Sequence, residues 1–176
     1  MKRFSVRDKK FMRAALRQAS VAKKAGNYPI GAVLVVNGRI IAKEHNKKEN
    51  KADRISHAEM LLFLRHSKNI FKWNKHGKAK IELFTTFEPC LMCLGASVVH
   101  RIHRIVVACK DPRGDISTIK PEKIGVWYKR NWPAIEYGLF SRESLNLMLD
   151  FFKKRMDLES REAFDLLSDV ARSKNG

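Results

Sequence analysis

The 176-residue sequence predicts one α/β domain built on a five-stranded mixed sheet. Three observations indicate this class: a hairpin signal at Asn37-Gly38, a strand-helix-strand unit over 81–109, and amphipathic helices before and after them. The length suits a single domain, and a content of 44% hydrophobic residues suits a folded core. We see no internal repeat and no low-complexity linker.

The first elements are a helix and a hairpin. Residues 5–25 have helical apolar spacing, Ser5 and Asp8 have the spacing of a capping box, and Gly26 stops the helix. Two apolar runs then flank Asn37-Gly38, a dipeptide that strongly favours a type I′ turn. We therefore expect two antiparallel strands.

A helix is predicted at 56–67, after a polar loop at 44–55. Ser56 and Glu59 have the spacing of a capping box, and an apolar run follows them. A cap alone would explain both residues, so this stretch leaves open whether Glu59 carries chemistry. A basic connector at 68–80 follows.

The next unit has two strands, 81–87 and 104–109, around a helix at 89–99 with Pro89 at its first position. Because a helix crosses between them, these strands should be parallel. Beyond this unit we expect, in order, a mostly irregular segment at 112–133, a short strand near 135–139, an amphipathic helix that Ser141 caps, and a last helix at 159–172.

Charge divides the chain into a basic body and an acidic extension. The whole sequence holds 36 basic and 18 acidic residues, a formal net charge of +18, whereas residues 157–176 hold three basic and five acidic ones. A basic body over 1–156 favours a polyanionic partner, although a generally Lys-rich composition would look the same. We expect the extension to pack on the body or on a dimer partner, or to act as a lid.

Membrane and secretory signals are missing from the sequence. No apolar run approaches the roughly 20 residues that span a bilayer, and the charged N-terminus has no apolar h-region behind it. The three cysteines do not have the spacing of a disulfide framework, so a reducing compartment is favoured. We expect a cytoplasmic protein without a membrane partner.

Three residues have the character of zinc ligands. Cys90 and Cys93 lie three residues apart at the start of a helix, whose dipole favours their thiolates. With His57 they make three ligands for one tetrahedral Zn²⁺ per chain, and the fourth position stays open for water, as in catalytic sites. Cys109 ends an apolar strand and is expected in the core.

His57-x-Glu59 followed by Pro89-Cys90-x-x-Cys93 resembles the signature of zinc nucleobase deaminases. The resemblance covers roughly residues 5–156 and is strongest to tRNA adenosine deaminases and their guanine deaminase relatives. It implies a three-layer α/β/α, cytidine-deaminase-like fold. The similar segments are NYPIGAVLVVNGRIIAKEHN, SHAEM, TTFEPCLMCLGASVVHRIHRIVVACKD and IEYGLFSRESLNLMLDFFKKR.

The resemblance also implies roles for individual residues. Glu59 would be the catalytic proton shuttle between water, the ring nitrogen and the leaving amine. Asn46 would hydrogen-bond the base, Pro29 and Ile30 would line its pocket, and the backbone near Ala58 and Cys90 would contact base or water. Asp111 would be an acidic substrate contact, or only the Asp of a DPRG turn.

Three function classes follow. A tRNA-specific enzyme would form inosine from adenosine at the wobble position. It would need few base contacts and many phosphate contacts, for which the candidates are Lys47, Lys48, Arg54, Lys110 and Arg113. A free-base enzyme would act on guanine or cytosine, and a non-catalytic zinc protein would be expected to lack Glu59.

The segment 112–133 departs from the pattern of the tRNA enzymes, because it holds Trp127, Tyr128 and Trp132. These aromatic side chains would stack on bases or pack in the core or a dimer.

Overall fold

A computed structural model describes residues 4–75, 77, 79–155 and 157–173. Its centre is a five-stranded mixed sheet with the order β2-β1-β3-β4-β5, as predicted. β1 runs antiparallel to β2 and to β3, whereas β3, β4 and β5 are parallel to one another. The strands are β1 Gly31–Val36, β2 Arg39–His45, β3 Ile81–Phe87, β4 Arg104–Cys109 and β5 Ala134–Tyr137.

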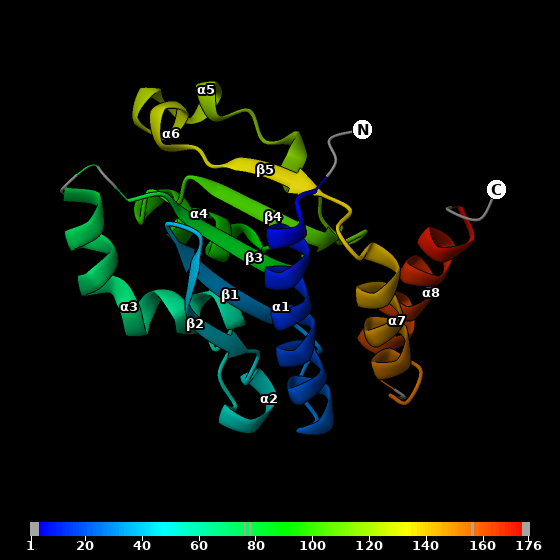
Figure 1. The fold of residues 1–176 in the computed structure, drawn as a ribbon. Coiled ribbons are helices and arrows are strands. Elements are labelled where there is room, and N and C mark those ends of the chain that lie inside the picture. Colours follow the sequence, from blue (N-terminus) through cyan, green and yellow to red (C-terminus); the bar gives the residue numbers. More distant parts are fainter. Residues whose placement is uncertain (1–3, 76, 78, 156, 174–176) are drawn as a thin grey trace.

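Helices cover both faces of this sheet and make the predicted three layers. α1 and α7 lie on one face, α3 and α4 lie on the other, and α8 packs on α7 (Figure 1). The helices are α1 Val6–Lys24, α2 Lys48–Lys51, α3 Ala58–Lys75, α4 Leu91–Val99, α5 Pro121–Ile124, α6 Val126–Asn131, α7 Ser141–Phe152 and α8 Leu158–Ser173.

Local signals in the first fifty residues give the predicted structure. Ser5 and Asp8 form a complete capping box at the start of α1. Asn37 and Gly38 both have positive φ, which a type I′ turn requires and which joins β1 to β2 in the expected hairpin. Gly31 allows α1 to approach β1 closely, because a Cβ there would lie 2.1 Å from the carbonyl oxygen of Ala15.

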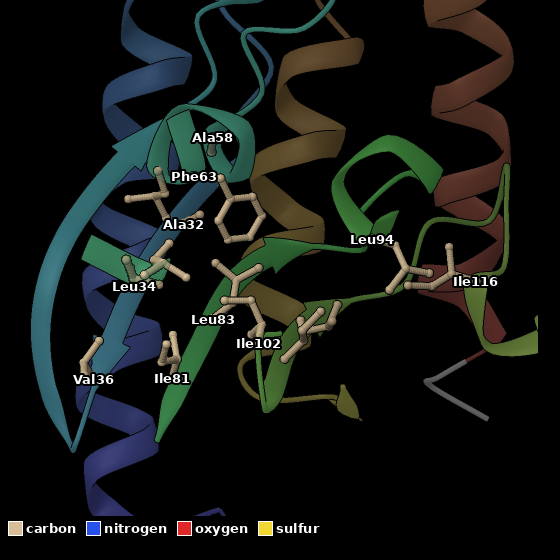
Figure 2. Packing of buried hydrophobic residues seen from close by; sticks show 14 residues of the cluster. Ala32, Leu34, Val36, Ala58, Phe63, Ile81, Leu83, Leu94, Ile102 and Ile116 are labelled. Carbon is tan, nitrogen blue, oxygen red and sulfur yellow. The ribbon is translucent and has the colours of Figure 1, made fainter. Parts of the chain in front are cut away.

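Side chains along β1 point alternately to the two faces of the sheet and contribute to a hydrophobic cluster on each face. Val33 and Val35 pack with the α1 side chains, whereas Ala32 and Leu34 pack with α3 and α4. Figure 2 shows the cluster on the α3 side, in which Phe63 of α3 lies near Leu83 of β3 and Leu94 of α4 lies beside Ile116. Cys109 is fully buried, as predicted.

Several elements begin or end at other residues than predicted. α3 begins at Ala58 instead of residue 56 and continues to Lys75, because Ile70 and Trp73 extend its apolar face into the segment predicted as a connector. The segment predicted as mostly irregular contains α5, α6 and a 3₁₀ turn at Ile116–Thr118. Ser141 is the first residue of α7 and does not cap it, since the N-cap position is Phe140 with φ 59°.

The C-terminal helix α8 packs its apolar face on the body of the domain. Ala163 and Leu167 are buried beside Phe152 and Met148 of α7. Residues 174–176 of the extension lie outside the described residues. Among the described residues, no helix has the length and apolarity needed to span a membrane.

Arg104 joins four elements at the amino ends of the parallel strands. Its guanidinium donates hydrogen bonds to Asp8 of α1 at 2.8 Å, to Glu82 of β3 at 3.0 Å and to Glu136 of β5 at 2.7 Å. The four side chains are between 8% and 23% exposed. This end of the sheet therefore carries a partly buried ion network, opposite the ends that lead to the predicted site.

Candidate metal centre

His57, Cys90 and Cys93 converge as predicted. Nδ1 of His57 lies 3.6 Å from the Sγ atoms of both cysteines, and the three ligand atoms are all within 4.8 Å of one another. Around a tetrahedral zinc ion, nitrogen and sulfur ligands are separated by about 3.6 Å. The donor set and its spacing therefore fit Zn²⁺, and no second group of this kind occurs among the described residues.

The predicted capping box at the start of α3 is absent. Asp53 accepts hydrogen bonds from both the backbone N–H and the hydroxyl of Ser56, each at 2.6 Å. An ionised carboxylate is a strong acceptor, so it outcompetes the cap for Ser56. Glu59 is thereby free to turn inward, and His57 precedes the helix instead of starting it.

The two cysteines occupy the first turn of α4. Cys90 has an extended backbone and is the N-cap residue, so Pro89 lies two residues before the first helical residue, Leu91, and does not occupy the first position as predicted. A hydrogen bond from Cys93, with a second from His57, lowers the pKa of Cys90 to about 4, and the same contact raises the pKa of Cys93. Cys90 is thus readily available as the thiolate that binds zinc, and metal binding displaces the proton that Cys93 holds.

Glu59 lies beside the zinc ligands and is 2% exposed. Its Oε2 is 3.7 Å from the Sγ of Cys93, and its Oε1 accepts a 2.7 Å hydrogen bond from the Thr85 hydroxyl. Burial raises the pKa of Glu59 against the opposing effect of that hydrogen bond. A carboxyl group with a raised pKa beside a metal site is suited to general acid-base chemistry.

The residues expected around the base lie on adjacent backbone segments. The N–H of Asn46 donates to the carbonyl of Ile30, and the N–H of Lys47 donates to the carbonyl of Ser56. These bonds bring the Pro29-Ile30 segment and Asn46 beside the start of α3. Pro29, Asn46 and Ala58 are buried and Ile30 is partly buried.

Asp111 lies in a turn after β4 and lines the same surface cavity as Cys90. Its carboxylate accepts hydrogen bonds from the backbone N–H, Nε and Nη2 of Arg113, at 3.0, 2.9 and 2.9 Å. Its own N–H donates to Glu88, which also accepts from the hydroxyl of Tyr137. Asp111, Arg113 and Cys90 line a surface cavity of about 680 Å³.

The predicted phosphate-binding residues divide into paired and unpaired cations. Lys47 pairs with Glu44, Lys110 with Asp115, and Arg113 with Asp111. Lys48 lies 4.8 Å above the ring of Tyr28. Among the described residues, neither Lys48 nor Arg54 has an acidic partner within 4.0 Å.

The structure adds residues that the sequence analysis missed. Thr85 contacts Glu59, and Glu88 links the Cys90 segment to Asp111 and Tyr137. Two adjacent threonines in the otherwise apolar strand before the Pro89-Cys90 motif were the available signal for Thr85. Trp127 and Tyr128 are 43% and 38% exposed, so core packing, one of their expected uses, is wrong for both.

Known proteins are similar to this chain in sequence. A family model of the cytidine and deoxycytidylate deaminase zinc-binding region matches residues 5–109. The tRNA-specific adenosine deaminase of Bacillus subtilis (strain 168) is 41% identical over 147 residues, which cover 84% of this chain and 89% of that protein. The tRNA-specific adenosine deaminase of Aquifex aeolicus (strain VF5) is 33% identical, with 82% and 93% covered.

Solved structures agree with the fold. A structure from a study of A-to-I editing by tRNA:A34 deaminases matches with a TM-score of 0.63 at 30% identity, covering 78% of this chain and 98% of that one. A guanine deaminase from Nitrosomonas europaea matches with a TM-score of 0.66 at 23% identity, over 81% and 83% of the two chains. The resemblance, the fold class and the zinc cofactor predicted from the sequence are confirmed. The chain therefore belongs to the cytidine and deoxycytidylate deaminase family of zinc-dependent hydrolases.

Proposed function

We propose that this enzyme converts adenosine to inosine at the wobble position of a tRNA anticodon. The observation that carries the proposal is the 41% identity to a protein named for that activity, over a span that includes the whole metal centre. The guanine deaminase likeness rests on the shared fold alone. The basic body supplies the charge that a tRNA partner needs.

The reaction adds water at C6 of adenine and releases ammonia. Zinc held by His57, Cys90 and Cys93 supplies a Lewis acid that activates water. Glu59 accepts the proton that the attacking water loses and delivers it to the ring nitrogen next to C6. Glu59 then takes the proton of the hydroxyl group now on C6 and passes it to the amine, so the carbon–nitrogen bond breaks, ammonia leaves and inosine remains.

Asn46 is the base-recognition residue in this proposal. Its Oδ1 accepts a 3.0 Å hydrogen bond from the N–H of Lys48, which orients the side-chain amide. The Nδ2 group is left to donate, so it selects a base edge that presents an acceptor, such as a purine ring nitrogen. Pro29, Ile30 and the backbone at Ala58 complete the pocket, and Asp111, whose carboxylate is paired with Arg113, is the acidic substrate contact.

Lys48 and Arg54 provide the strongest attraction for the RNA backbone. Both lie in the segment 47–56 between Asn46 and His57, and within the part of the chain that the structure describes neither has an acidic partner within 4.0 Å. Lys47, Lys110 and Arg113 also face phosphates in this proposal, but their acidic partners weaken their contribution to the field. The reaction takes place in the cytoplasm, where reducing conditions keep both zinc-binding thiolates intact.

A homodimer is the proposed assembly. Phe71 of α3, Val99 of α4 and Trp127 of α6 are exposed and line one cavity of about 490 Å³. Leu64 and Leu91 extend the same helices with further exposed apolar side chains. Such a patch marks an interface, and Phe71→Glu should convert a dimer to a monomer in analytical ultracentrifugation. A wild-type protein that sediments as a monomer would contradict this assembly.

The test is a substrate panel measured with zinc-loaded protein. An anticodon stem-loop with adenosine at the wobble position, free guanine, free cytosine, adenosine and cytidine are compared by ammonia release, and inosine is sequenced in the RNA. We expect inosine at the wobble position and no turnover of free bases. Turnover of guanine or cytosine without inosine in RNA would establish the free-base alternative.

Salt dependence tests the RNA contacts separately. Binding of the stem-loop should fall by at least about tenfold between 50 and 200 mM salt, as several phosphate contacts require. The slope of the logarithm of the binding constant against the logarithm of the salt concentration measures these contacts. Lys48→Gln and Arg54→Gln should each reduce this slope more than Lys47→Gln does. Lys10→Gln is the matched control, because Lys10 is exposed on α1 near Asp8, at the far end of the sheet. Asn46→Ala should lower turnover with little effect on the slope, and equal slopes for all variants would refute the assignment.

A further inference from the structure

Thr85 of β3 is a fully buried polar side chain to which the family resemblance assigns no role. The neighbouring Thr86 serves the fold, since its hydroxyl accepts a 3.0 Å hydrogen bond from the N–H of Gly31. The Thr85 hydroxyl instead meets Glu59, a residue of a different element, from the side of the sheet. A buried hydroxyl with this partner is a candidate for a role in the reaction.

The contact with Thr85 gives the two oxygens of the Glu59 carboxylate different surroundings. Oε1 is held by the Thr85 hydroxyl at 2.7 Å, whereas Oε2 lies 3.7 Å from the Sγ of Cys93 and faces the metal ligands. The Thr85 Oγ1 also lies 3.1 Å from the carbonyl oxygen of Phe87, within the same strand. One carboxylate oxygen is therefore anchored on the sheet, and the other points to the reacting groups.

We propose that Thr85 is a positioning residue that fixes the carboxylate of Glu59 for proton transfer. A hydroxyl both donates and accepts, so Thr85 stays paired with Glu59 when the carboxylate carries the transferred proton, while its own proton turns to the Phe87 carbonyl. The strand holds Thr85 rigidly, because β3 is paired on both sides, with β1 and with β4. This inference rests on the deaminase reaction of the proposed function but not on the choice of substrate.

The experiment compares Thr85→Val, which removes the hydroxyl at nearly constant volume, with Thr85→Ser, which keeps it. Because a misplaced catalytic group costs up to about 100-fold in rate, we expect Thr85→Val to lower kcat by about 10- to 100-fold. KM should stay within about threefold of wild type and zinc at one ion per chain, because neither the pocket nor the ligands change. Thr85→Ser should restore kcat to within about threefold of wild type.

A double-mutant cycle and a control exclude a merely structural effect. Thr85→Val should add no loss to Glu59→Gln, because the hydroxyl acts through that carboxylate. Thr86→Val removes an equally buried hydroxyl from the same strand, and thermal unfolding reports the stability of every variant. If Thr85→Val does not fold, Thr85→Ala replaces it. The proposal is overturned if kcat is unchanged, if Thr86→Val lowers kcat equally, if Thr85→Ser fails as badly as valine, or if the two losses add.

The substrate for these assays is the one that wild type converts in the panel above, either the stem-loop RNA or a free base. Failure of the tRNA proposal therefore appears in wild type alone. Failure of the Thr85 proposal appears only in the ratios between variants. The two outcomes are distinguishable in the same set of measurements.

Discussion

Replacing Arg104 with methionine should destabilise the protein strongly at neutral pH. The change leaves Asp8, Glu82 and Glu136 without the cation that all three contact, while their side chains remain 8% to 23% exposed. Removing one partner of a buried ion network costs about 3–5 kcal/mol, and the partial exposure of these groups favours the lower end, about 3 kcal/mol. For a domain of this size, the melting temperature should fall by about 6–12 °C.

The difference in free energy of unfolding between wild type and Arg104→Met should become smaller at acidic pH. Burial raises the pKa of Asp8, but hydrogen bonds from Arg104 and Ser5 outweigh it and leave that pKa below its ordinary value of 3.8. A lowered folded-state pKa contributes stability that is present above the ordinary value and is lost as the pH falls through the folded-state pKa. Wild type should therefore lose this contribution below about pH 4, whereas Arg104→Met has already lost it.

Urea unfolding of the zinc-loaded protein at several pH values measures both effects. Arg39→Met is the matched control, because Arg39 is an exposed arginine at the start of β2. That variant should change the free energy of unfolding by less than about 0.5 kcal/mol. A loss below about 1 kcal/mol for Arg104→Met, or a gap between it and wild type that does not narrow in acid, would refute the reasoning.

Further predictions concern the metal, the shuttle and the packing of α1. Cys90→Ala should purify without zinc, while wild type carries one ion per chain by metal analysis; undiminished zinc would show that the ligand is misassigned. Glu59→Ala should keep its zinc but lose about 10²- to 10⁴-fold in kcat, and a loss under about tenfold would rule out proton transfer by this residue. Gly31→Ala should cost about 1–3 kcal/mol in thermal unfolding, because its Cβ would overlap the backbone of α1. Gly95→Ala, which meets nothing within 4 Å, should stabilise the protein; equal behaviour of the two would contradict the packing argument.

The metal centre was predictable in part because the spacing of Cys90 and Cys93 is local and puts both on one helical turn. His57 lies 33 residues before Cys90, and the resemblance to the deaminase signature joined it and Glu59 to the cysteines. The hairpin at Asn37-Gly38 and the first helix cap were predictable from local spacing as well.

Side-chain pairings around the site were not predictable from one sequence, whether the partners lie near each other in the chain or far apart. Ser56 and Glu59 have the spacing of a capping box, but they do not pair with each other. The Ser56 hydroxyl donates a hydrogen bond to Asp53, and Glu59 accepts one from Thr85 of a separate strand. Likewise, nothing in the spacing of Arg113 shows that its guanidinium engages the carboxylate of Asp111. Competition among nearby acceptors decides such pairings, and it depends on the folded geometry.

The parallel arrangement of β3, β4 and β5 places the Arg104 network and the loops around the metal centre at opposite ends of the sheet. The Arg104 network joins the strands at their amino ends, whereas the loops that reach the metal centre leave from their carboxyl ends. The segment from Asp111 to Trp132 is one of those loops, and it is inserted after β4 without interrupting the strand that leads to Cys90. Changes in the length or sequence of this segment would therefore alter the surroundings of the metal centre while the ligands and the sheet stay in place.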